Sequence, residues 1–269
     1  MTLSNTMLDV KQLKISFGGL DAVTGVDMYV NRGELLGLIG PNGAGKTTIF
    51  NMLTGVYVPT SGTIELSDGY GKMNRIEGLK PHVVALRGVS RTFQNIRLFK
   101  ELSVLDNLRI AMHKNVKHSI IEALFRLPGY RHDEKLFYDN AIHILKLVGL
   151  LEKKDTLAKN LSYGEQRRLE IARAIATGGK LIFLDEPAAG MNPSETEELR
   201  ELILELKDEF SLTIVLIEHD MKFVMNLCER IYVLEFGSII AEGTPDEIRS
   251  NERVIRAYLG EDKKQKPKQ

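Results

Sequence analysis

Residues 40–47 constrain the fold of this chain more than any other stretch of its sequence. They read GPNGAGKT and match the pattern G-x-x-x-x-G-K-[ST]. The apolar run at 34–39 predicts a buried strand before them, and residues 48–54 predict a helix after them, closed by Gly55. A glycine-rich turn between a strand and a helix directs backbone N–H groups and the positive end of the helix dipole at one point. The stretch therefore predicts a loop that binds a polyphosphate, and the flanking elements disfavour a chance match.

The polar side chains of this loop have expected roles. Lys46 is expected to reach the β- and γ-phosphates of a nucleotide, and the Thr47 hydroxyl is expected to ligate Mg²⁺. The backbone of the loop is expected to surround the phosphates. The predicted nucleotide-binding residues of this stretch are Gly40, Pro41, Asn42, Gly43, Ala44, Gly45, Lys46, Thr47 and Thr48.

The overall composition limits the classes of protein to consider. The chain has 269 residues, enough for one large α/β domain, and 36 basic residues balance 36 acidic ones. This balance argues against a surface that binds nucleic acid through bulk positive charge. No apolar stretch approaches the ~20 residues that a membrane-spanning helix needs, so a role at a membrane is expected to depend on partner subunits. Cys228 is the only cysteine and is expected to be a buried apolar residue.

The order of the expected elements indicates an α/β fold. Alternating apolar residues in the N-terminal region predict an antiparallel sheet that includes strands around Phe17 and Met28. Between 103 and 151 the pattern is helical, and the Pro-Gly pair at 128–129 predicts a turn inside this region. After residue 160, strands and helices alternate, which predicts a mostly parallel core sheet with helices on both faces.

The chain is expected to form a single domain over residues 1–260. The helical region is expected to be a subdomain inserted at about 95–160. Residues 261–269, rich in lysine, are expected to form a disordered basic tail.

Two carboxylates, Asp185 and Glu186, directly follow the apolar run at 181–184. The carboxyl ends of parallel strands form the edge at which open α/β sheets bind their ligands. Asp185 is therefore expected to organise Mg²⁺, directly or through water, and Glu186 is expected to orient or deprotonate an attacking water molecule. The alternative interpretation is a strand followed by an acidic helix cap.

Residues 161–166, LSYGEQ, form a third motif. Ser162 and Glu165 have the S-x-x-E spacing of a capping box, and Gly164 permits close approach to the helix start. Alone, this stretch predicts a well-capped helix and nothing more. Together with the phosphate loop and the two carboxylates, it resembles the signature of the ATP-binding-cassette (ABC) ATPases, which are P-loop NTPases.

The resemblance implies a site shared between two subunits. In that family, the start of the signature helix covers the γ-phosphate of an ATP held by the opposing subunit, and a helix start is an anion site on physical grounds. The implied cofactors are ATP and Mg²⁺. The signature residues in this chain are Ser162, Tyr163, Gly164, Glu165 and Gln166.

The resemblance covers nearly the whole chain and implies further site residues. Gln94 matches a glutamine that contacts Mg²⁺ and water and joins the helical lobe to the core, and His219 matches a histidine that contacts the γ-phosphate. Phe17 stands where an aromatic residue stacks on adenine. Without the resemblance, Gln94 is an ordinary loop residue, His219 a structural histidine and Phe17 a core residue. The implied catalytic residues are Glu186, His219 and Gln94, and the implied metal ligands are Thr47, Gln94 and Asp185.

Asn192 departs from the family pattern. Many relatives have an aspartate in this loop, the D-loop, which communicates across the dimer. Asn192 lacks that negative charge but can hydrogen-bond and cap the helix that follows, with Pro193 at the first helical position. The resemblance therefore implies a contact with the partner in altered form.

The finer resemblance is to the larger ATPase subunit of the high-affinity branched-chain amino-acid importer. It rests on Tyr163 and on the runs at 91–94, 97–99, 167–173, 185–193, 217–221 and 255–260. It implies an ATP-hydrolysing subunit at the cytoplasmic face of a cell membrane. The implied partners are a second ATPase subunit in a homo- or heterodimer, two membrane permease subunits and an extracytoplasmic solute-binding protein.

Three alternatives are an importer of urea or short amides, an ATPase of lipid or lipopolysaccharide export, and a soluble cassette protein acting on ribosomes or DNA. The soluble class is disfavoured because the chain has no second cassette, no long coiled coil and no basic surplus. Glu186 argues against a fourth class, a regulatory module that does not hydrolyse ATP.

Overall fold

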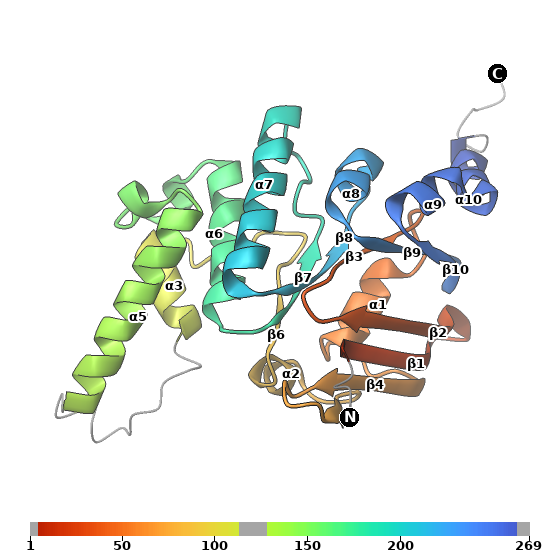
Figure 1. Cartoon of the computed structure of the whole chain (residues 1–269), viewed down its shortest axis with the longest axis horizontal. Helices are drawn as coiled ribbons and strands as arrows, with labels where there is room; N and C mark the ends of the chain where they lie inside the picture. The colour runs from red at the N-terminus through yellow and green to blue at the C-terminus, as the bar shows by residue number, and fades with distance from the viewer. Residues whose placement is uncertain (1–4, 113–127, 263–269) are drawn as a thin grey trace.

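The chain forms two sheets and a layer of helices (Figure 1). The computed structural model describes residues 5–112 and 128–262. The strands of the first sheet are β1 (Thr6–Phe17), β2 (Leu20–Asn31), β4 (Ser61–Ser67) and β5 (Met73–Arg75). Those of the second are β3 (Leu35–Ile39), β6 (Val89–Arg91), β7 (Leu181–Asp185), β8 (Thr213–Ile217), β9 (Arg230–Glu235) and β10 (Ser238–Gly243). The helices are α1 (Lys46–Leu53), α2 (Pro81–Leu86), α3 (Val104–Met112), α5 (Pro128–Leu147), α6 (Tyr163–Ala176), α7 (Pro193–Phe210), α8 (Met221–Leu227), α9 (Pro245–Ser250) and α10 (Glu252–Asp262), with short 3-10 turns at Leu151–Lys153 and Ala158–Asn160.

The two sheets differ in strand direction. The first is antiparallel, in the order β2-β1-β4-β5. The second has the order β10-β9-β3-β8-β7-β6, in which β9, β3, β8, β7 and β6 are parallel and β10 pairs antiparallel with β9. The parallel strands bring their carboxyl ends to one edge of the sheet, where the phosphate loop also begins.

The central parallel strands are mostly apolar, because both faces of their sheet are covered. All five residues of β3, of β7 and of β8 are buried. Neighbouring residues point to opposite faces. Phe183 packs with α1 and the antiparallel sheet, and its ring lies 4.9 Å from that of Phe50, whereas Leu184 packs with the helical layer. The sheet therefore separates two cores, with α1 in one and α6 in the other.

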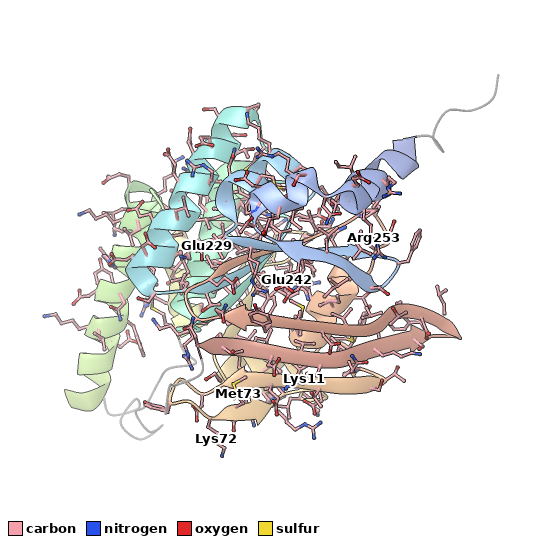
Figure 2. All side chains as sticks on the ribbon, turned by 45° about the vertical axis from the view of Figure 1, so that its right-hand side comes forward. Lys11, Lys72, Met73, Glu229, Glu242 and Arg253 are labelled. Carbon is pink, nitrogen blue, oxygen red and sulfur yellow. The ribbon has the colours of Figure 1, made fainter. Side chains whose placement is uncertain are left out.

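The antiparallel sheet has one face on the core and one in solvent. Met28 and Val30 of β2 are buried, whereas Tyr29 between them is exposed. Figure 2 labels Lys11 on β1 and Lys72 directly before β5, and both are exposed. This alternation is typical of an antiparallel sheet with a single covered face.

Helices α3, α5 and α6 pack on one another on the left of Figure 1. Leu108 of α3, Leu145 of α5 and Leu169 of α6 are buried in the same core. The turn predicted at 128–129 is wrong, because α5 begins at Pro128. Proline is tolerated in the first turn of a helix, where its missing N–H would have no partner within the helix.

The predicted fold class is confirmed in its antiparallel N-terminal sheet, its mostly parallel core sheet and its helices. The first two residues of the predicted tail are helical, because α10 runs to Asp262, and residues 263–269 lie outside the described residues. The boundaries of the domain and of the helical insertion stay predictions. Among the helices that the structure describes, none has both the length and the apolar character that crossing a membrane requires.

Candidate functional site

Two glycines of the loop at 40–47 leave no room for a side chain. Gly40 has φ +150°, and a Cβ there would lie 2.0 Å from the carbonyl oxygen of Leu234. Gly45 has φ +105°, and a Cβ there would lie 2.8 Å from the carbonyl oxygen of Ala22. Backbone of β9 and β2 therefore lies against the loop, and only glycine fits at these two positions. Helix α1 then begins at Lys46, next to the loop, as the sequence predicts.

Lys46 folds back over this loop. It is 5% exposed, and its Nζ donates hydrogen bonds to the carbonyl oxygens of Gly40, at 2.6 Å, and Pro41, at 2.9 Å. The ammonium group thus lies beside the first turn of α1, where the backbone N–H groups have no partner within the helix. Positive charge and helix-start N–H groups together fit an anion with several phosphate oxygens. In the rest of the predicted loop, Asn42, Gly43 and Thr47 are exposed, Gly45 and Thr48 are partly buried, and Ala44 is buried.

Gln94 and His219 meet at the carboxylate of Glu186. Gln94 Nε2 donates a 2.9 Å hydrogen bond to Glu186 Oε2, and His219 Nε2 lies 2.5 Å from Glu186 Oε1. Gln94 follows β6, Glu186 follows β7 and His219 follows β8, so three parallel strands deliver these residues to one edge of the sheet. The structure therefore brings the three predicted catalytic residues together, and their chemical roles stay predictions.

The backbone of Glu186 has φ +48°, in the left-handed region that non-glycine residues seldom adopt. Its N–H donates to the carbonyl oxygen of Ile217 at 2.9 Å, and its own carbonyl oxygen accepts a hydrogen bond from Arg167 Nη2 at 3.3 Å. Such conformations persist where the surrounding structure holds them, and they cluster at functional sites. The peptide groups on both sides of Glu186 are held in this way.

Asp185, at the end of β7, is 3% exposed and pairs with a cation that the sequence did not reveal. Its Oδ2 accepts a 2.7 Å hydrogen bond from Arg91 Nη2, and Arg91 Nη1 donates to Asn51 Oδ1 of α1, also at 2.7 Å. A buried carboxylate requires an opposite charge nearby, and Arg91 supplies it. The position of Arg91 three residues before Gln94 could have marked it as a residue of the site.

The residues predicted to ligate Mg²⁺ fit this ion by their chemistry. Asp185 offers a carboxylate, Thr47 a hydroxyl and Gln94 an amide oxygen. Mg²⁺ takes oxygen ligands, typically one or two carboxylates together with phosphate oxygens and water. The contact of Arg91 with both Asp185 and Asn51 ties the carboxylate to helix α1, which carries Thr47.

Phe17 is not a plain core residue, because it is 47% exposed at the end of β1. Its ring contacts that of Tyr57 edge to face, with centroids 5.4 Å apart and an interplanar angle of 71°. An exposed aromatic ring can stack on a planar ligand. Tyr57 was not predicted, and no spacing in the sequence points to its contact with Phe17.

The predicted capping box at the start of α6 is confirmed. The Ser162 N–H donates to Glu165 Oε2 at 2.9 Å, and the Glu165 N–H donates to Ser162 Oγ at 3.4 Å. Gln166 Nε2 donates to the carbonyl oxygen of Leu161 at 2.9 Å, which fixes the same turn. Helices α1 and α6 pack on opposite faces of the parallel sheet. The helix that follows the phosphate loop and the signature helix of the same chain therefore lie on different sides of the sheet.

Tyr163 and Asn192 connect the signature helix with the loop that follows Glu186. Tyr163 OH donates a 3.0 Å hydrogen bond to the carbonyl oxygen of Ala189. Asn192 caps α7 as predicted, since its Oδ1 accepts from the Glu195 N–H at 3.0 Å. A Cβ on Gly164 would lie 3.9 Å from Glu195 Oε1, so the two helix starts are neighbours. A contact of Asn192 with a partner subunit stays a prediction.

Glu218 is a further residue that sequence reasoning missed. It is 4% exposed, and burial raises the pKa of its carboxyl. Its oxygens accept hydrogen bonds from the N–H groups of Ala188, at 2.8 Å, and His219, at 3.0 Å. This carboxyl therefore ties the loop after β7 to the end of β8, and its position directly before His219 was the available signal.

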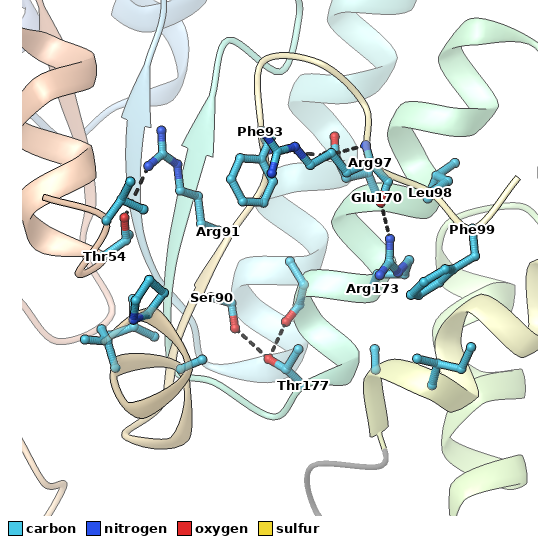
Figure 3. Close-up of a pocket in the computed structure, with 18 residues that line it drawn as sticks. Thr54, Ser90, Arg91, Phe93, Arg97, Leu98, Phe99, Glu170, Arg173 and Thr177 are labelled. Atoms are coloured by element: carbon cyan, nitrogen blue, oxygen red, sulfur yellow. Dashed lines mark hydrogen bonds between the residues drawn. The ribbon is translucent and has the colours of Figure 1, made fainter. Parts of the chain in front are cut away.

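A groove of about 830 Å³ lies between the core and the helical layer (Figure 3). One wall is α6, where Arg173 donates to the carbonyl oxygen of Arg97 and lies 4.9 Å from the ring of Phe99. Phe99 and Ile110 are 45% and 41% exposed, so the groove has apolar surface that is open to solvent. Its other lining residues are Thr54, Val56, Pro81, Val84, Ala85, Val89, Ser90, Arg91, Phe93, Leu98, Ala111, Glu170, Ala174 and Thr177.

Two family profiles match the sequence. The profile described as ABC transporter matches residues 23–189, and the profile described as branched-chain amino acid ATP-binding cassette transporter matches residues 238–264. The first match includes the phosphate loop, Gln94, the signature helix, Asp185 and Glu186.

Individual relatives resemble the chain over almost its full length. The high-affinity branched-chain amino acid transport ATP-binding protein LivG of Salmonella typhimurium is 50% identical, over 96% of this chain and 100% of that protein. The lipopolysaccharide export system ATP-binding protein LptB of Escherichia coli is 36% identical, over 95% of this chain and 98% of that protein. The solved structure of the ADP conformation of MJ1267, an ATP-binding cassette of an ABC transporter, has a TM-score of 0.79 at 32% identity, over 95% of this chain and 99% of that chain.

Proposed function

The chain belongs to the family of ABC transporter ATP-binding proteins, and from that premise we propose that it powers the uptake of branched-chain amino acids. It is an ATPase, as its family is. The observation that supports branched-chain amino acids as the cargo is the 50% identity to LivG over 96% of the chain. The separate match of residues 238–264 to a branched-chain amino acid transporter profile supports the same cargo, and the identity to LptB, 36%, is lower.

The proposed chemistry is the attack of water on the γ-phosphorus of ATP, which forms a new phosphorus–oxygen bond and breaks the bond to the bridging oxygen, so that ADP leaves. Glu186 is proposed as the base that accepts a proton from the water. Gln94 and His219, both in contact with the Glu186 carboxylate, are proposed to orient the water and to contact the γ-phosphate. Lys46 is proposed to stabilise negative charge on the β- and γ-phosphates. Mg²⁺, when bound, neutralises charge between these phosphates, and Thr47, Asp185 and Gln94 would hold it.

We propose that each ATP is enclosed by two subunits. The phosphate loop and Glu186 of one subunit face the start of α6 in the other, so Ser162 contacts a nucleotide that its own chain does not hold. The placement of α1 and α6 on opposite faces of the sheet supports this division of the site. ATP then favours a closed dimer, and hydrolysis removes the contacts that are made only in the closed state.

The proposed partners place the chain at the cytoplasmic face of a membrane. Two permease subunits would contact the ATPase pair, and an extracytoplasmic binding protein would deliver the amino acid. The groove beside α6 is proposed as the permease contact because it is apolar, open and lined by residues 93 and 97–99, which follow Gln94 closely. A movement of Gln94 when the dimer closes would thus shift the groove residues that contact the permease.

Uptake measured in cells of the source organism tests the cargo. With Glu186→Gln in the only copy of the gene, uptake of leucine, isoleucine and valine at low external concentration is expected to be lost. Urea uptake and the lipopolysaccharide content of the surface are expected to stay normal. Normal leucine uptake, with a loss of either of the other two, would contradict the proposal and assign the chain to that alternative transporter.

A charge in the groove is expected to uncouple the chain from its permeases. Ile110→Glu puts a carboxylate on apolar surface that a partner would cover, so leucine uptake is expected to fall about tenfold or more. ATP hydrolysis by the isolated subunit is expected to stay within roughly twofold, because Ile110 does not touch the nucleotide site. Leu136→Glu, at a 48% exposed position on α5 outside the groove, is the matched control. If both variants lose uptake equally, or if neither loses it, the proposed contact between the groove and a permease is contradicted.

A further inference from the structure

Tyr163, Arg167 and Glu170 form one face of α6, because residues three and four apart are neighbours on a helix surface. We call these three residues the strut face. Tyr163 OH reaches the carbonyl oxygen of Ala189 at 3.0 Å, and Arg167 Nη2 reaches that of Glu186 at 3.3 Å. The strut face therefore contacts the backbone at Glu186 and three residues beyond it.

Arg167 makes most of these contacts from a fully buried position. It is 0% exposed. Its Nη1 donates to the carbonyl oxygen of Phe93 at 2.9 Å and to Glu170 Oε2 at 2.8 Å, and its Nη2 also donates to the carbonyl oxygen of Gln94 at 3.2 Å. One planar guanidinium thus joins the Gln94 loop, the Glu186 backbone and the signature helix, in the fork geometry that arginine provides.

Glu170 contacts the same loop through backbone N–H groups, whereas Arg167 contacts its carbonyl oxygens. Its Oε1 accepts hydrogen bonds from the N–H groups of Phe93, at 3.2 Å, and Arg97, at 3.4 Å. Figure 3 shows Glu170 beside Phe93 and Arg97, at the wall of the groove. Burial raises the pKa of this carboxyl, and the charge of Arg167 opposes the shift. In this buried ion pair, both carboxylate oxygens and both terminal guanidinium nitrogens have hydrogen-bond partners, whereas Arg167 Nε has none among the described residues.

We propose that Arg167 is a positioning residue for ATP hydrolysis, which acts by fixing Glu186 and Gln94 relative to the start of the signature helix. The left-handed backbone of Glu186 has partners for both of its peptide groups, and its carbonyl oxygen accepts hydrogen bonds from the Ala189 N–H, at 3.2 Å, and from the charged Nη2 of Arg167, at 3.3 Å. Without it, the Glu186 carbonyl loses a charged donor, and the carboxylate can move away from Gln94 and His219. Since a shift of the base by about 1 Å can cost on the order of 100-fold in rate, kcat is the sensitive quantity.

This inference rests on the proposed function and extends it. The first turn of α6 is proposed to meet the nucleotide of the partner subunit, whereas Arg167, further along the same helix, holds the residues around the chain's own nucleotide. A rigid helix with both contacts transmits the arrival of the partner's ATP to Glu186. The strut face would thus couple the two ATP sites of a dimer.

The test replaces both members of the ion pair, because Arg167→Met alone would leave the buried Glu170 carboxylate without its hydrogen-bonded counter-charge. In the double variant Arg167→Met/Glu170→Gln, the glutamine oxygen can still accept from Phe93 and Arg97. The matched control is Glu197→Gln/Arg200→Met, which removes an i,i+3 glutamate–arginine pair from α7, where Glu197 is exposed. A third variant, Arg167→Lys, keeps the charge but not the fork of donors.

The readouts are Tm, kcat and KM for ATP in the full chain. The double variant is expected to have a lower Tm than the control, because the carbonyl oxygens of Phe93 and Gln94 lose a donor. It is expected to stay folded at the assay temperature with a KM within about twofold, while kcat falls on the order of 100-fold. Arg167→Lys is expected to give an intermediate kcat. Unchanged kcat, a loss of kcat matched by an equal rise in KM, or a loss that only follows the fraction of unfolded chain at the assay temperature, would overturn the positioning role. Failure of the proposed function would give a different result, because the wild-type chain and the control variant would then both lack ATP hydrolysis that depends on Glu186.

Discussion

Replacing Glu186 with glutamine is expected to abolish ATP turnover and to leave ATP binding intact. Glutamine has nearly the same shape and can still bond Gln94 and His219, which now lie 2.9 Å and 2.5 Å from the carboxylate oxygens. It cannot accept a proton from water, and loss of a general base costs on the order of 100- to 10,000-fold in rate. Steady-state phosphate release and equilibrium binding of labelled ATP measure the two effects separately.

The same substitution is expected to trap a dimer. Since ATP is proposed to favour the closed state and hydrolysis to open it, a chain that binds but does not hydrolyse ATP should elute as a dimer in size-exclusion chromatography with ATP. Glu209→Gln is the matched control, because Glu209 is an exposed carboxylate whose Oε1 lies 2.9 Å from His143 Nε2. Normal hydrolysis by the Glu186 variant, with only monomer in ATP, would refute its assignment as the base.

Replacing Ser162 with arginine is expected to block turnover without weakening the binding of ATP to the same chain. The long arginine side chain would occupy the space at the start of α6 where a partner's γ-phosphate is proposed to lie. The contact of the Ser162 hydroxyl with that phosphate would also be lost. Removal of one such contact to a transferring group costs on the order of 100-fold or more in kcat. The isolated chain should still bind ATP normally, because its own phosphate loop is unchanged.

Thr244→Arg separates this effect from the loss of a helix cap. Thr244 caps α9 with the same kind of capping box, in which Glu247 replaces Glu165 as the partner. Each substitution is expected to cost about 1 kcal/mol of stability. Only the Ser162 variant is expected to lose turnover, and weak ATP binding by its isolated chain would refute the contact with a partner's nucleotide.

Local sequence patterns predicted the parts of the site that depend on one strand and the turn after it. The glycines at 40 and 45, the apolar strand before Asp185 and the capping boxes at Ser162 and Asn192 each leave such a pattern, and each lies where it was predicted. The convergence of Gln94, Glu186 and His219 follows from the rule that parallel strands end at one edge. The assignment of Gln94 and His219 nevertheless depended on family resemblance, because a lone glutamine or histidine in a loop has no distinguishing pattern.

The supporting residues could not be predicted because their partners are distant in the sequence. Arg91 and Asp185 are 94 residues apart, and Arg167 and Phe93 are 74 apart. An arginine on an amphipathic helix is usually solvated, so only the packing of α6 on the core reveals that Arg167 is buried. The turn predicted at 128–129 failed for a local reason, because proline suits the first turn of a helix as well as a loop.

The central claim, that each catalytic site is shared between two chains, is tested most directly by mixing two inactive variants. A dimer of one Glu186→Gln chain and one Ser162→Arg chain would contain one site with an intact Glu186 and an intact Ser162. In an equimolar mixture, ATP hydrolysis should return to about a quarter of the wild-type rate, because half of the dimers are mixed and each has one complete site. If the mixture stays as inactive as either variant alone, while both chains still bind ATP and dimerise, the shared site is contradicted.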